Sequence, residues 1–275
     1  MAEADPETGV KDPEFLSTLE RGLRVLVAFD EDHPEMTLTE VSARTDLSPA
    51  VARRCLKTLV EIGYIGQRER KFLLRPSVLT IGSAFLASMQ IEQVVLPSLQ
   101  HLRDQTGDSA SLAVLSGAEI LYVAHVSTDR RFRVAANVGT RFPFHATSLG
   151  KALAAHLTAP EQAELLAPAP FQRFTERTIT DHTAMEQRLA VVLERGYDSA
   201  LDELDYGIVS VAVPLFGRDG RVIAAINCST STTRISQDEL VRTRLPLLRG
   251  AAGEITAALK RWPALEASLR PAKIK

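Results

Sequence analysis

The sequence predicts two folded parts, a mainly α-helical N-terminal domain and a larger α+β domain, joined by a linker helix. The length of 275 residues exceeds the common size of one domain, so two domains are expected. Residues 15–75 combine helical spacing of apolar residues with two short β-rich runs, whereas β-rich runs alternate with helical segments beyond Ile91. A hydrophobic content of 45% is ordinary for a globular protein and provides apolar side chains for two cores.

Changes in composition predict the domain boundaries. Residues 1–14 hold five acids, one lysine and two prolines, which is typical of a disordered tail. The remaining segments are a helical and hairpin domain over 15–75, a linker helix over 76–92, an α+β domain over 93–262 and a C-terminal tail over 263–275.

The first domain is expected to contain three helices and a β-hairpin. Thr37 followed by Glu40 forms a capping box that starts the second helix, and "DEDHPEM" before it is expected to be a loop. Ser48 is the expected N-cap of the third helix, with Pro49 at its first position and Gly63 at its end. Strands are expected on either side of a charged tip at 68–70. This order of elements is typical of a winged helix-turn-helix.

Charge is sorted within this domain. Residues 15–47 hold three bases and seven acids, whereas residues 48–75 hold seven bases and two acids. Duplex DNA requires such a localised positive face, and the second helix of the turn enters its major groove. A solvated charged face is the alternative, but it leaves the ordered elements around the charges unexplained. The DNA-contacting candidates are Ser48, Ala50, Val51, Arg53, Arg54 and Lys57 on the helix, and Arg68, Arg70 and Lys71 on the wing.

The larger domain is expected to form one antiparallel sheet covered by helices. β-rich runs cover 109–116 and 119–127 around Gly117, and a further pair covers 208–216 and 221–229. A long closing helix is expected to be kinked at Pro246.

No catalytic, metal or cofactor site is expected in this domain. The six histidines lack metal-ligand spacing, and neither a phosphate loop nor a nucleophile elbow is present. Asp202, Glu203 and Asp205 lie close together, but a solvated or capping role is the more frequent one for such a cluster. The two cysteines are too far apart in sequence to suggest a disulfide framework. Because no apolar run approaches the roughly 20 residues of a membrane span, we expect a cytoplasmic, nucleoid-associated protein without a membrane partner.

Five stretches of this sequence resemble the IclR family of bacterial transcriptional regulators. The match is closest to the PcaR, PcaU and PobR branch, which controls protocatechuate, β-ketoadipate and 4-hydroxybenzoate catabolism. The resemblance implies a GAF-like effector-binding domain, dimers formed through the DNA-binding domains, and tetramers formed through the effector domains. The stretches are "LERGLRVLVAF", "RRCLKTLVEIGYI", "RPSVLTIGSAFLAS", "NVGTRFPFHATSLGKALAA" and "DELDYGIVSVAVPLFGRDGRVIAAINCS", and they span most of residues 15–259.

The resemblance also implies an effector pocket on one side of the sheet. Two features depart from a simple transfer: Arg131 and Val134 have opposite strand parity, so a bulge must intervene if both line one pocket, and Ala200 stands where some members carry an acid. The implied pocket residues are Arg131, Val134, Phe142, Ser148, Leu149, Ala200, Asp202, Ser210, Asn227 and Ser229.

The residues themselves support part of this pocket. Asn227 and Ser229 share a strand face with Ile223 and Ala225, and polar groups on an apolar face suit a ligand cavity. The alternative is a face that meets water. A carboxylate effector would be held by the N–H groups that begin the "SLGKA" helix or by a cation. The candidate cations are Arg131, which we favour, Arg133 and Arg141.

The sequence therefore predicts a ligand-responsive DNA-binding regulator of an aromatic-acid catabolic operon. The expected partners are a palindromic double-stranded operator, a small aromatic or dicarboxylic acid, and a second copy of the chain in a dimer or tetramer; RNA polymerase is a further candidate. One alternative is an enzyme with a nucleic-acid-binding regulatory module, which the lack of a paired nucleophile and base disfavours. The other is an architectural DNA-binding protein without a ligand.

Overall fold

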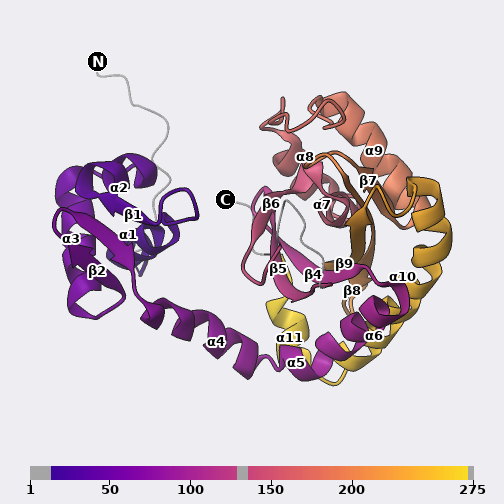
Figure 1. The fold of residues 1–275 in the computed structure, drawn as a ribbon, viewed down its shortest axis with the longest axis horizontal. Helices are drawn as coiled ribbons and strands as arrows, with labels where there is room; N and C mark the ends of the chain where they lie inside the picture. The colour runs from indigo at the N-terminus through magenta and orange to yellow at the C-terminus, as the bar shows by residue number, and fades with distance from the viewer. Residues whose placement is uncertain (1–13, 129–135, 272–275) are drawn as a thin grey trace, which may run out of the picture. The chain divides into compact units, whose positions relative to one another are not determined.

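The computed structural model describes residues 14–128 and 136–271. The chain divides into two compact units, Met1–Phe85 and Leu86–Lys275, which are described separately (Figure 1). The predicted disordered tail over 1–14 lies outside the described residues, apart from Glu14.

The first unit combines helices with a small antiparallel sheet. β3 is the central strand of this sheet, with β1 on one side and β2 on the other. The elements are α1 (Ser17–Val27), β1 (Glu35–Thr37), α2 (Leu38–Thr45), α3 (Pro49–Glu61), β2 (Ile65–Arg68), β3 (Lys71–Leu74), the 3-10 turn η1 (Pro76–Val78) and α4 (Leu79–Ser88), which runs past the division between the units.

Local sequence explains most of these boundaries. The capping box is confirmed, because the Thr37 hydroxyl accepts the Glu40 N–H and the Glu40 carboxylate accepts the Thr37 N–H. Ser48 is the N-cap of α3, although its side chain makes no capping hydrogen bond. Gly63 follows α3 with a φ of 80°, a conformation that favours glycine.

The expected loop before Thr37 was wrong at its end. Glu35–Thr37 forms β1, which pairs with β3, and Met36 from this strand is fully buried. Met36 packs with Val41 and Leu56 in the core of the first unit. β1 therefore connects the β2–β3 hairpin, which is the wing, to the helical core, and the hairpin is held in a fixed place beside α3.

The second unit is built on a curled antiparallel sheet. Among the described residues it has six strands in the order β6-β5-β4-β9-β8-β7. Its elements are α5 (Ile91–Val94), α6 (Leu96–Thr106), β4 (Ser109–Ser116), β5 (Glu119–Val126), β6 (Arg141–Pro143), the 3-10 turn η2 (Phe144–Ala146), α7 (Ser148–Ala154), α8 (Ala159–Leu166), α9 (His182–Arg195), β7 (Asp198–Leu201), β8 (Ile208–Phe216), β9 (Val222–Ser231), α10 (Gln237–Leu259) and α11 (Pro263–Ser268).

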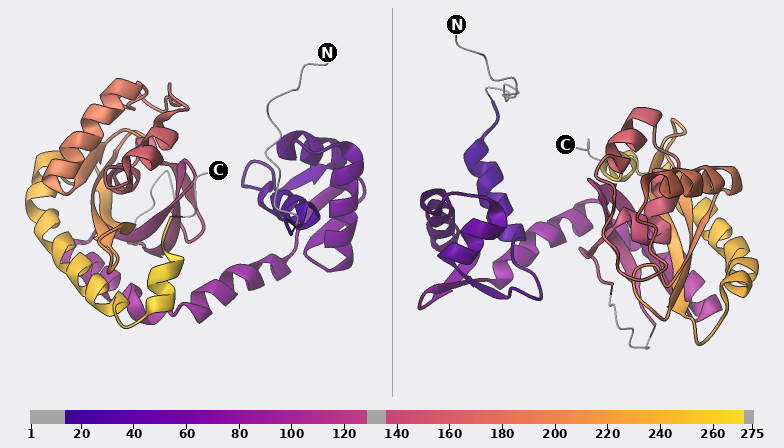
Figure 2. Two further views of the ribbon diagram at one scale, coloured as in Figure 1. Left: turned by 180° about the vertical axis from the view of Figure 1, so that it is seen from behind. Right: turned by 90° about the horizontal axis from the view of Figure 1, so that it is seen from above.

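Helices cover both faces of this sheet. α6 and α10 pack on the outer face, whereas α7 lies inside the curve against β8 and β9 (Figures 1 and 2). The inner core joins Leu149 and Leu153 of α7 to Leu189 of α9 and to Ala113 and Ala225 of the sheet. Small sheet residues at these positions let α7 approach closely, and the part of the inner face that α7 leaves uncovered becomes available for a cavity.

A β-bulge changes which side chains of β5 face inward. Leu112 pairs with Ala124, but the next residue, Ala113, pairs with Tyr122, so one extra residue of β5 lies between them. The bulge places Tyr122 and His125 on the same face of the sheet, although they are three residues apart.

Other sequence predictions for this unit had mixed outcomes. The hairpins around Gly117 and between β8 and β9 are confirmed, and α10 continues through Pro246. β7 and α8 were not predicted. The predicted tail over 263–275 was wrong at its start, because α11 follows α10 directly and buries Leu265 and Glu266.

Within residues 14–128 and 136–271, no helix combines the length and apolar character needed to cross a membrane. The same residues contain no cluster of side chains suited to hold a metal ion.

Candidate functional site

α3 presents positive side chains to solvent. Arg53 and Lys57 lie one helical turn apart and are exposed, as are Ser48 and Ala50 at the start of the helix. Within the described part of the chain, neither Arg53 nor Lys57 forms an ion pair, and no acid lies in the first turn. A positive helix face without internal counter-ions is suited to the phosphates and groove edges of duplex DNA.

The structure separates two predicted DNA contacts from this exposed face. Val51 is half-buried and packs on the core of the first unit, so only part of its side chain is accessible to DNA. Arg54 is exposed but borders an apolar groove between α1 and α3. The groove has a volume of about 710 Å³ and includes Leu19, Leu23, Ile62 and Ile81.

The wing carries its positive charge differently. The Arg68 guanidinium lies 3.0 Å from one carboxylate oxygen of Glu35, and the Lys71 ammonium lies 2.8 Å from the other. The Lys71 hydrogen bond holds the pKa of the Glu35 carboxyl below its usual value. Arg70, at the exposed tip, forms no ion pair among the described residues. The wing is therefore less positive than its three cations suggest.

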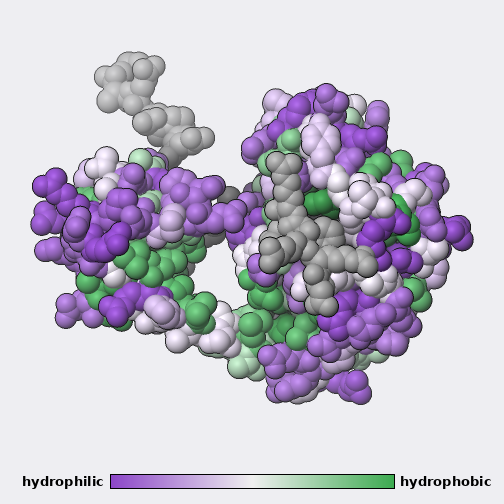
Figure 3. Space-filling model, in the orientation of Figure 1, coloured by the Kyte–Doolittle hydropathy of each residue, from purple (hydrophilic) through white to green (hydrophobic). Residues whose placement is uncertain are grey.

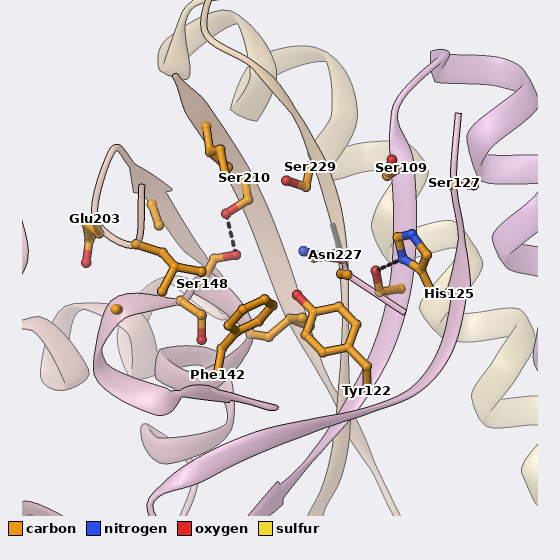
Figure 4. A pocket seen from close by; sticks show the side chains of 18 of the residues that line it. Ser109, Tyr122, His125, Ser127, Phe142, Ser148, Glu203, Ser210, Asn227 and Ser229 are labelled. Carbon is orange, nitrogen blue, oxygen red and sulfur yellow. Dashed lines mark hydrogen bonds between the residues drawn. The ribbon is translucent and has the colours of Figure 1, made fainter. Parts of the chain in front are cut away.

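The second unit contains a cavity on the inner face of its sheet. Its volume is about 470 Å³, which lies within the usual range for small-molecule sites. A cavity of about 150 Å³ already admits a benzene ring, so a substituted aromatic acid fits in this one. The strands β4, β5, β8 and β9 form its floor, and the start of α7 forms one wall (Figure 4).

Strand register arranges the polar floor of the cavity in two rows. In the first row, Ser111 of β4 lies between His125 of β5 and Asn227 of β9. In the second row, Ser229 of β9 lies between Ser109 of β4 and Ser210 of β8. Hydrogen-bonding groups from two hairpins that are distant in sequence, β4–β5 and β8–β9, therefore converge on one small volume.

Two hydrogen bonds orient groups in these rows. The Ser111 hydroxyl lies 2.9 Å from His125 Nδ1, and the Ser148 hydroxyl of α7 lies 2.8 Å from that of Ser210. Burial lowers the pKa of His125, so its imidazole is neutral near pH 7. Asn227 is only 4% exposed, and its Oδ1 has no hydrogen-bond partner among the described residues. A buried amide oxygen left unpaired is costly, which marks a site that a ligand can complete.

Aromatic rings line the apolar side of the cavity. Tyr122 and Phe142 meet edge to face with ring centroids 5.7 Å apart, and Figure 4 shows both below Asn227. Burial raises the pKa of Tyr122, so its phenol stays protonated. These rings and Leu149 give a flat ligand an apolar surface beside the polar rows.

A buried charge cluster supports the wall formed by α7. The fully buried Lys151 ammonium pairs with Glu203 and lies 3.4 Å from Asp198, whose second oxygen lies 2.7 Å from Arg188. Burial raises the pKa of Glu203, and the Lys151 charge opposes this shift. The cluster thus contains two cations and two carboxylates, so the charge of Lys151 is balanced by acids within the cluster.

The glycine of "SLGKA" fixes how closely α7 packs. A Cβ atom added to Gly150 would lie 2.2 Å from the carbonyl oxygen of Phe144, closer than any real contact. Only glycine therefore lets the first turn of α7 cross the η2 turn at this depth.

Models of known protein families match both units of the chain. The model of the IclR helix-turn-helix domain matches residues 18–69, and the model described as "Bacterial transcriptional regulator IclR C-terminal" matches residues 83–257. The chain belongs to the IclR family of transcriptional regulators. Its helix-turn-helix and its sheet domain are the two parts that define IclR regulators.

Two similar relatives are named as regulators of the Pca regulon and of p-hydroxybenzoate hydroxylase. The Pca regulon regulatory protein of Pseudomonas putida is 36% identical over 89% of this chain and 84% of its own length. The p-hydroxybenzoate hydroxylase transcriptional activator of Acinetobacter baylyi is 34% identical over 90% of this chain and 93% of its own. An IclR homolog from Microbacterium hydrocarbonoxydans, solved with 4-hydroxybenzoate, matches with a TM-score of 0.73 and 27% identity over 89% of this chain and 99% of that one.

The structure brings together most of the effector residues implied by resemblance to the IclR family. Those that line the cavity are Phe142, Ser148, Leu149, Ala200, Ser210, Asn227 and Ser229. Asp202 is not among the lining residues; its carboxylate accepts the Gly207 N–H at 2.7 Å and closes the loop between β7 and β8. Arg131 and Val134, and with them the candidate cation Arg133, lie outside the described residues. Arg141 is held by Glu119 and Ser116, so it does not serve the cavity.

Sequence reasoning missed part of the cavity. Ser109, Ser111, Tyr122 and His125 line it, and so does Glu203. The contact between the Ser111 hydroxyl and the His125 imidazole was not expected from the sequence either. Tyr122 and His125 have opposite parity along a regular strand, so only the bulge brings them to one face. The polar alternation of Ser109 and Ser111 in "SASLAVLS" was the available signal for the other two.

Proposed function

We propose that this IclR-family protein binds a palindromic operator through α3 and that a small aromatic acid in the cavity changes this binding. The observation that carries the proposal is the hydroxyl-rich, aromatic-lined cavity of about 470 Å³ in a chain that also exposes the unpaired cations of α3. The names of similar relatives support an aromatic acid of the protocatechuate or 4-hydroxybenzoate type, in a pathway such as β-ketoadipate catabolism. Linkage requires that a ligand which changes DNA affinity is itself bound differently in the presence of DNA.

The test measures binding of the full-length chain to duplexes from the DNA upstream of its own gene, by fluorescence anisotropy at about 0.15 M salt. We expect a sequence preference over a scrambled duplex, a steep loss of affinity with salt, and a shift in affinity or in DNA bending on addition of 4-hydroxybenzoate or protocatechuate. Equal binding to the scrambled duplex would contradict the operator assignment.

A cavity-filling variant serves as the matched control. Ser229→Leu places a larger side chain on the cavity floor, far along the chain from α3. The variant should bind the operator as the native protein does in the absence of ligand and lose the response to ligand. A response retained in this variant would place the effector elsewhere.

We propose a second copy of the chain as the partner for the groove between α1 and α3. Leu16, which precedes α1, and Leu19, Leu23 and Val27 within it are each at least 50% exposed. Figure 3 shows apolar side chains on the surface of the first unit. A palindromic operator has two equivalent half-sites, which a two-fold dimer of first units would read. Sedimentation at the concentrations used for DNA binding distinguishes a dimer or tetramer from the monomer that would contradict this proposal.

An enzymatic role is the second candidate, and only the contact between Ser111 and His125 favours it. Catalysis through this pair requires a group that orients the imidazole and donors for an oxyanion. Ser111 lies within β4 between two paired strands, where the sheet already uses the backbone N–H groups that an oxyanion would need. We therefore propose a binding role, and chromatographic recovery of unchanged ligand after prolonged incubation tests it.

A further inference from the structure

The inner face of the sheet has an apolar part and a polar part that meet within the cavity. Tyr122, Ala113 and Ala225 form a row across β5, β4 and β9. The next inward-facing row is His125, Ser111 and Asn227, so the chemistry changes from apolar to hydrogen-bonding in one step along the strands. An aromatic acid has the same division, with an apolar ring and one charged group.

His125 is the only basic side chain among the described residues that line the cavity. The lysine and arginine side chains of the elements packed around β5 each pair with an acid. Lys151 of α7 pairs with Glu203 and Asp198, Arg141 of β6 with Glu119, and Arg103 of α6 with Asp104. A ligand carboxylate that enters the described part of the cavity therefore meets one group that can become a cation.

The acidic side of the cavity favours the same orientation of the ligand. Figure 4 shows Glu203 and His125 on opposite sides of the cavity. A ligand carboxylate near Glu203 would be repelled by the Glu203 carboxylate. Lys151 would not offset this repulsion, because its charge is already shared between Glu203 and Asp198. The region of His125 and Asn227 contains no acid among the lining residues described.

The local geometry suits an imidazole that changes its protonation state. His125 Nδ1 faces the Ser111 hydroxyl, which can donate to a neutral ring or accept from a protonated one. Either state thus keeps this contact, while Nε2–H remains available as a donor. The Tyr122 ring lies edge-on to the imidazole with centroids 6.3 Å apart, and its protonated phenol adds no charge.

We propose that His125 holds the carboxylate of the effector and takes up a proton from solvent when the effector binds. The Asn227 side chain adds a second polar contact, and the aromatic ring lies against Tyr122 and Phe142. This inference rests on the proposed function, since it names the group in that cavity which recognises the acid. An anion within about 4–6 Å favours the charged form of a histidine, which reverses the effect of burial.

The sign of the pH dependence follows from linkage. The bound anion raises the His125 pKa above its value in the empty protein, where burial lowers it. Effector affinity should therefore rise as pH falls between these two values, by at most about tenfold for each pH unit. It should level off once the empty protein is itself protonated at His125. Above the higher pKa, binding takes up no proton.

Isothermal titration calorimetry of the full-length chain with 4-hydroxybenzoate tests the proposal. Titrations near pH 7 in phosphate, which has a small ionisation enthalpy, and in Tris, which has a large one, give the number of protons taken up. We expect a measurable uptake of up to about one proton in the native protein. His125→Gln keeps a hydrogen-bonding side chain that cannot titrate, so it should bind more weakly, with no uptake at this site and an affinity independent of pH.

Two controls separate the inference from the proposed function. The neutral analogue 4-hydroxybenzamide should bind the native protein without proton uptake. Arg141→Gln, at an arginine that pairs with Glu119 and does not line the cavity, should retain the proton uptake and the pH dependence. Binding without proton uptake, or unchanged uptake in His125→Gln, overturns this inference and leaves the proposed function standing. A native protein that binds none of the aromatic acids contradicts both.

Discussion

The two units of this chain treat charged side chains in opposite ways. On α3, Arg53 and Lys57 are exposed and have no acidic partner among the described residues. Around α7, Lys151 is fully buried and faces the carboxylates of Glu203 and Asp198. The first arrangement leaves charge available for a polyanion, and the second uses charge to hold a wall in place.

The comparison shows that the number of cations is a poor guide to function. Burying an ion is costly unless it is paired, so a buried lysine indicates an internal counter-ion. An exposed cation costs little, and its lack of a partner makes it available for binding. The wing is intermediate between α3 and the buried cluster. Its three cations are all exposed, but two of them form ion pairs with Glu35.

The largest effect is expected from removing the exposed pair. The double variant Arg53→Ala and Lys57→Ala should bind operator DNA at least about 30-fold more weakly, if each lost contact costs the roughly 1–3 kcal/mol of a base contact. Thermal unfolding should be nearly unchanged, because neither side chain has an ion pair to lose among the described residues. Fluorescence anisotropy measures the affinity.

The matched control is the double variant Arg177→Ala and Arg261→Ala. It removes the same charge from exposed positions in the second unit and should leave DNA binding intact. Equal losses of affinity in both double variants would indicate a non-specific charge effect.

The buried cluster should show the reverse behaviour. Lys151→Met leaves Glu203 and Asp198 without their shared cation, and breaking a buried pair typically costs about 3–5 kcal/mol of unfolding free energy. Urea denaturation measures this loss. Adding Glu203→Gln should restore part of the stability, because the carboxylate that lost its cation is then replaced by a neutral amide, whereas Asp198 keeps Arg188. A double variant no more stable than Lys151→Met would show that the lysine acts through packing and not through charge.

The smallest effect is expected at the wing. Glu35→Gln releases Arg68 and Lys71, so affinity for any duplex should rise a few-fold, and the salt dependence should steepen by up to about two counterions. Binding to a scrambled duplex over a series of salt concentrations measures both. The control Glu61→Gln removes an exposed acid that forms no ion pair with any residue the structure describes, and it should change binding less. Unchanged non-specific binding in Glu35→Gln would place the wing away from DNA.

Elements formed by nearby residues could be predicted from the sequence. The capping box at Thr37, the end of α3 near Gly63 and the hairpin of β4 and β5 were all predicted from local patterns. β1 and β7, of three and four residues, were missed because such short strands show no periodicity of their own. They exist because a neighbouring strand pairs with them.

The residues of the cavity likewise fall into some that the sequence predicted and some that depend on tertiary structure. The resemblance to the family predicted Ser148, Leu149, Asn227 and Ser229 as pocket residues. Strand alternation independently supported Asn227 and Ser229. All four residues line the cavity. Tyr122 and His125 were missed because the bulge between Leu112 and Ala113 reverses the parity that alternation predicts. Glu203 was assigned a solvated or capping role, whereas the fold buries it against Lys151 from a helix about 50 residues earlier.

The sequence by itself determined the positive face of α3, because the positions of side chains around a helix follow from their spacing alone. It also determined the order of the elements, through caps, turn residues and apolar periodicity. Only the tertiary structure decided which of the cations stay unpaired, since Glu35 reaches the wing through strand pairing. The tertiary structure alone also made the cavity, because the register of strands distant in sequence, together with one bulge, set His125 beside Ser111 and Asn227.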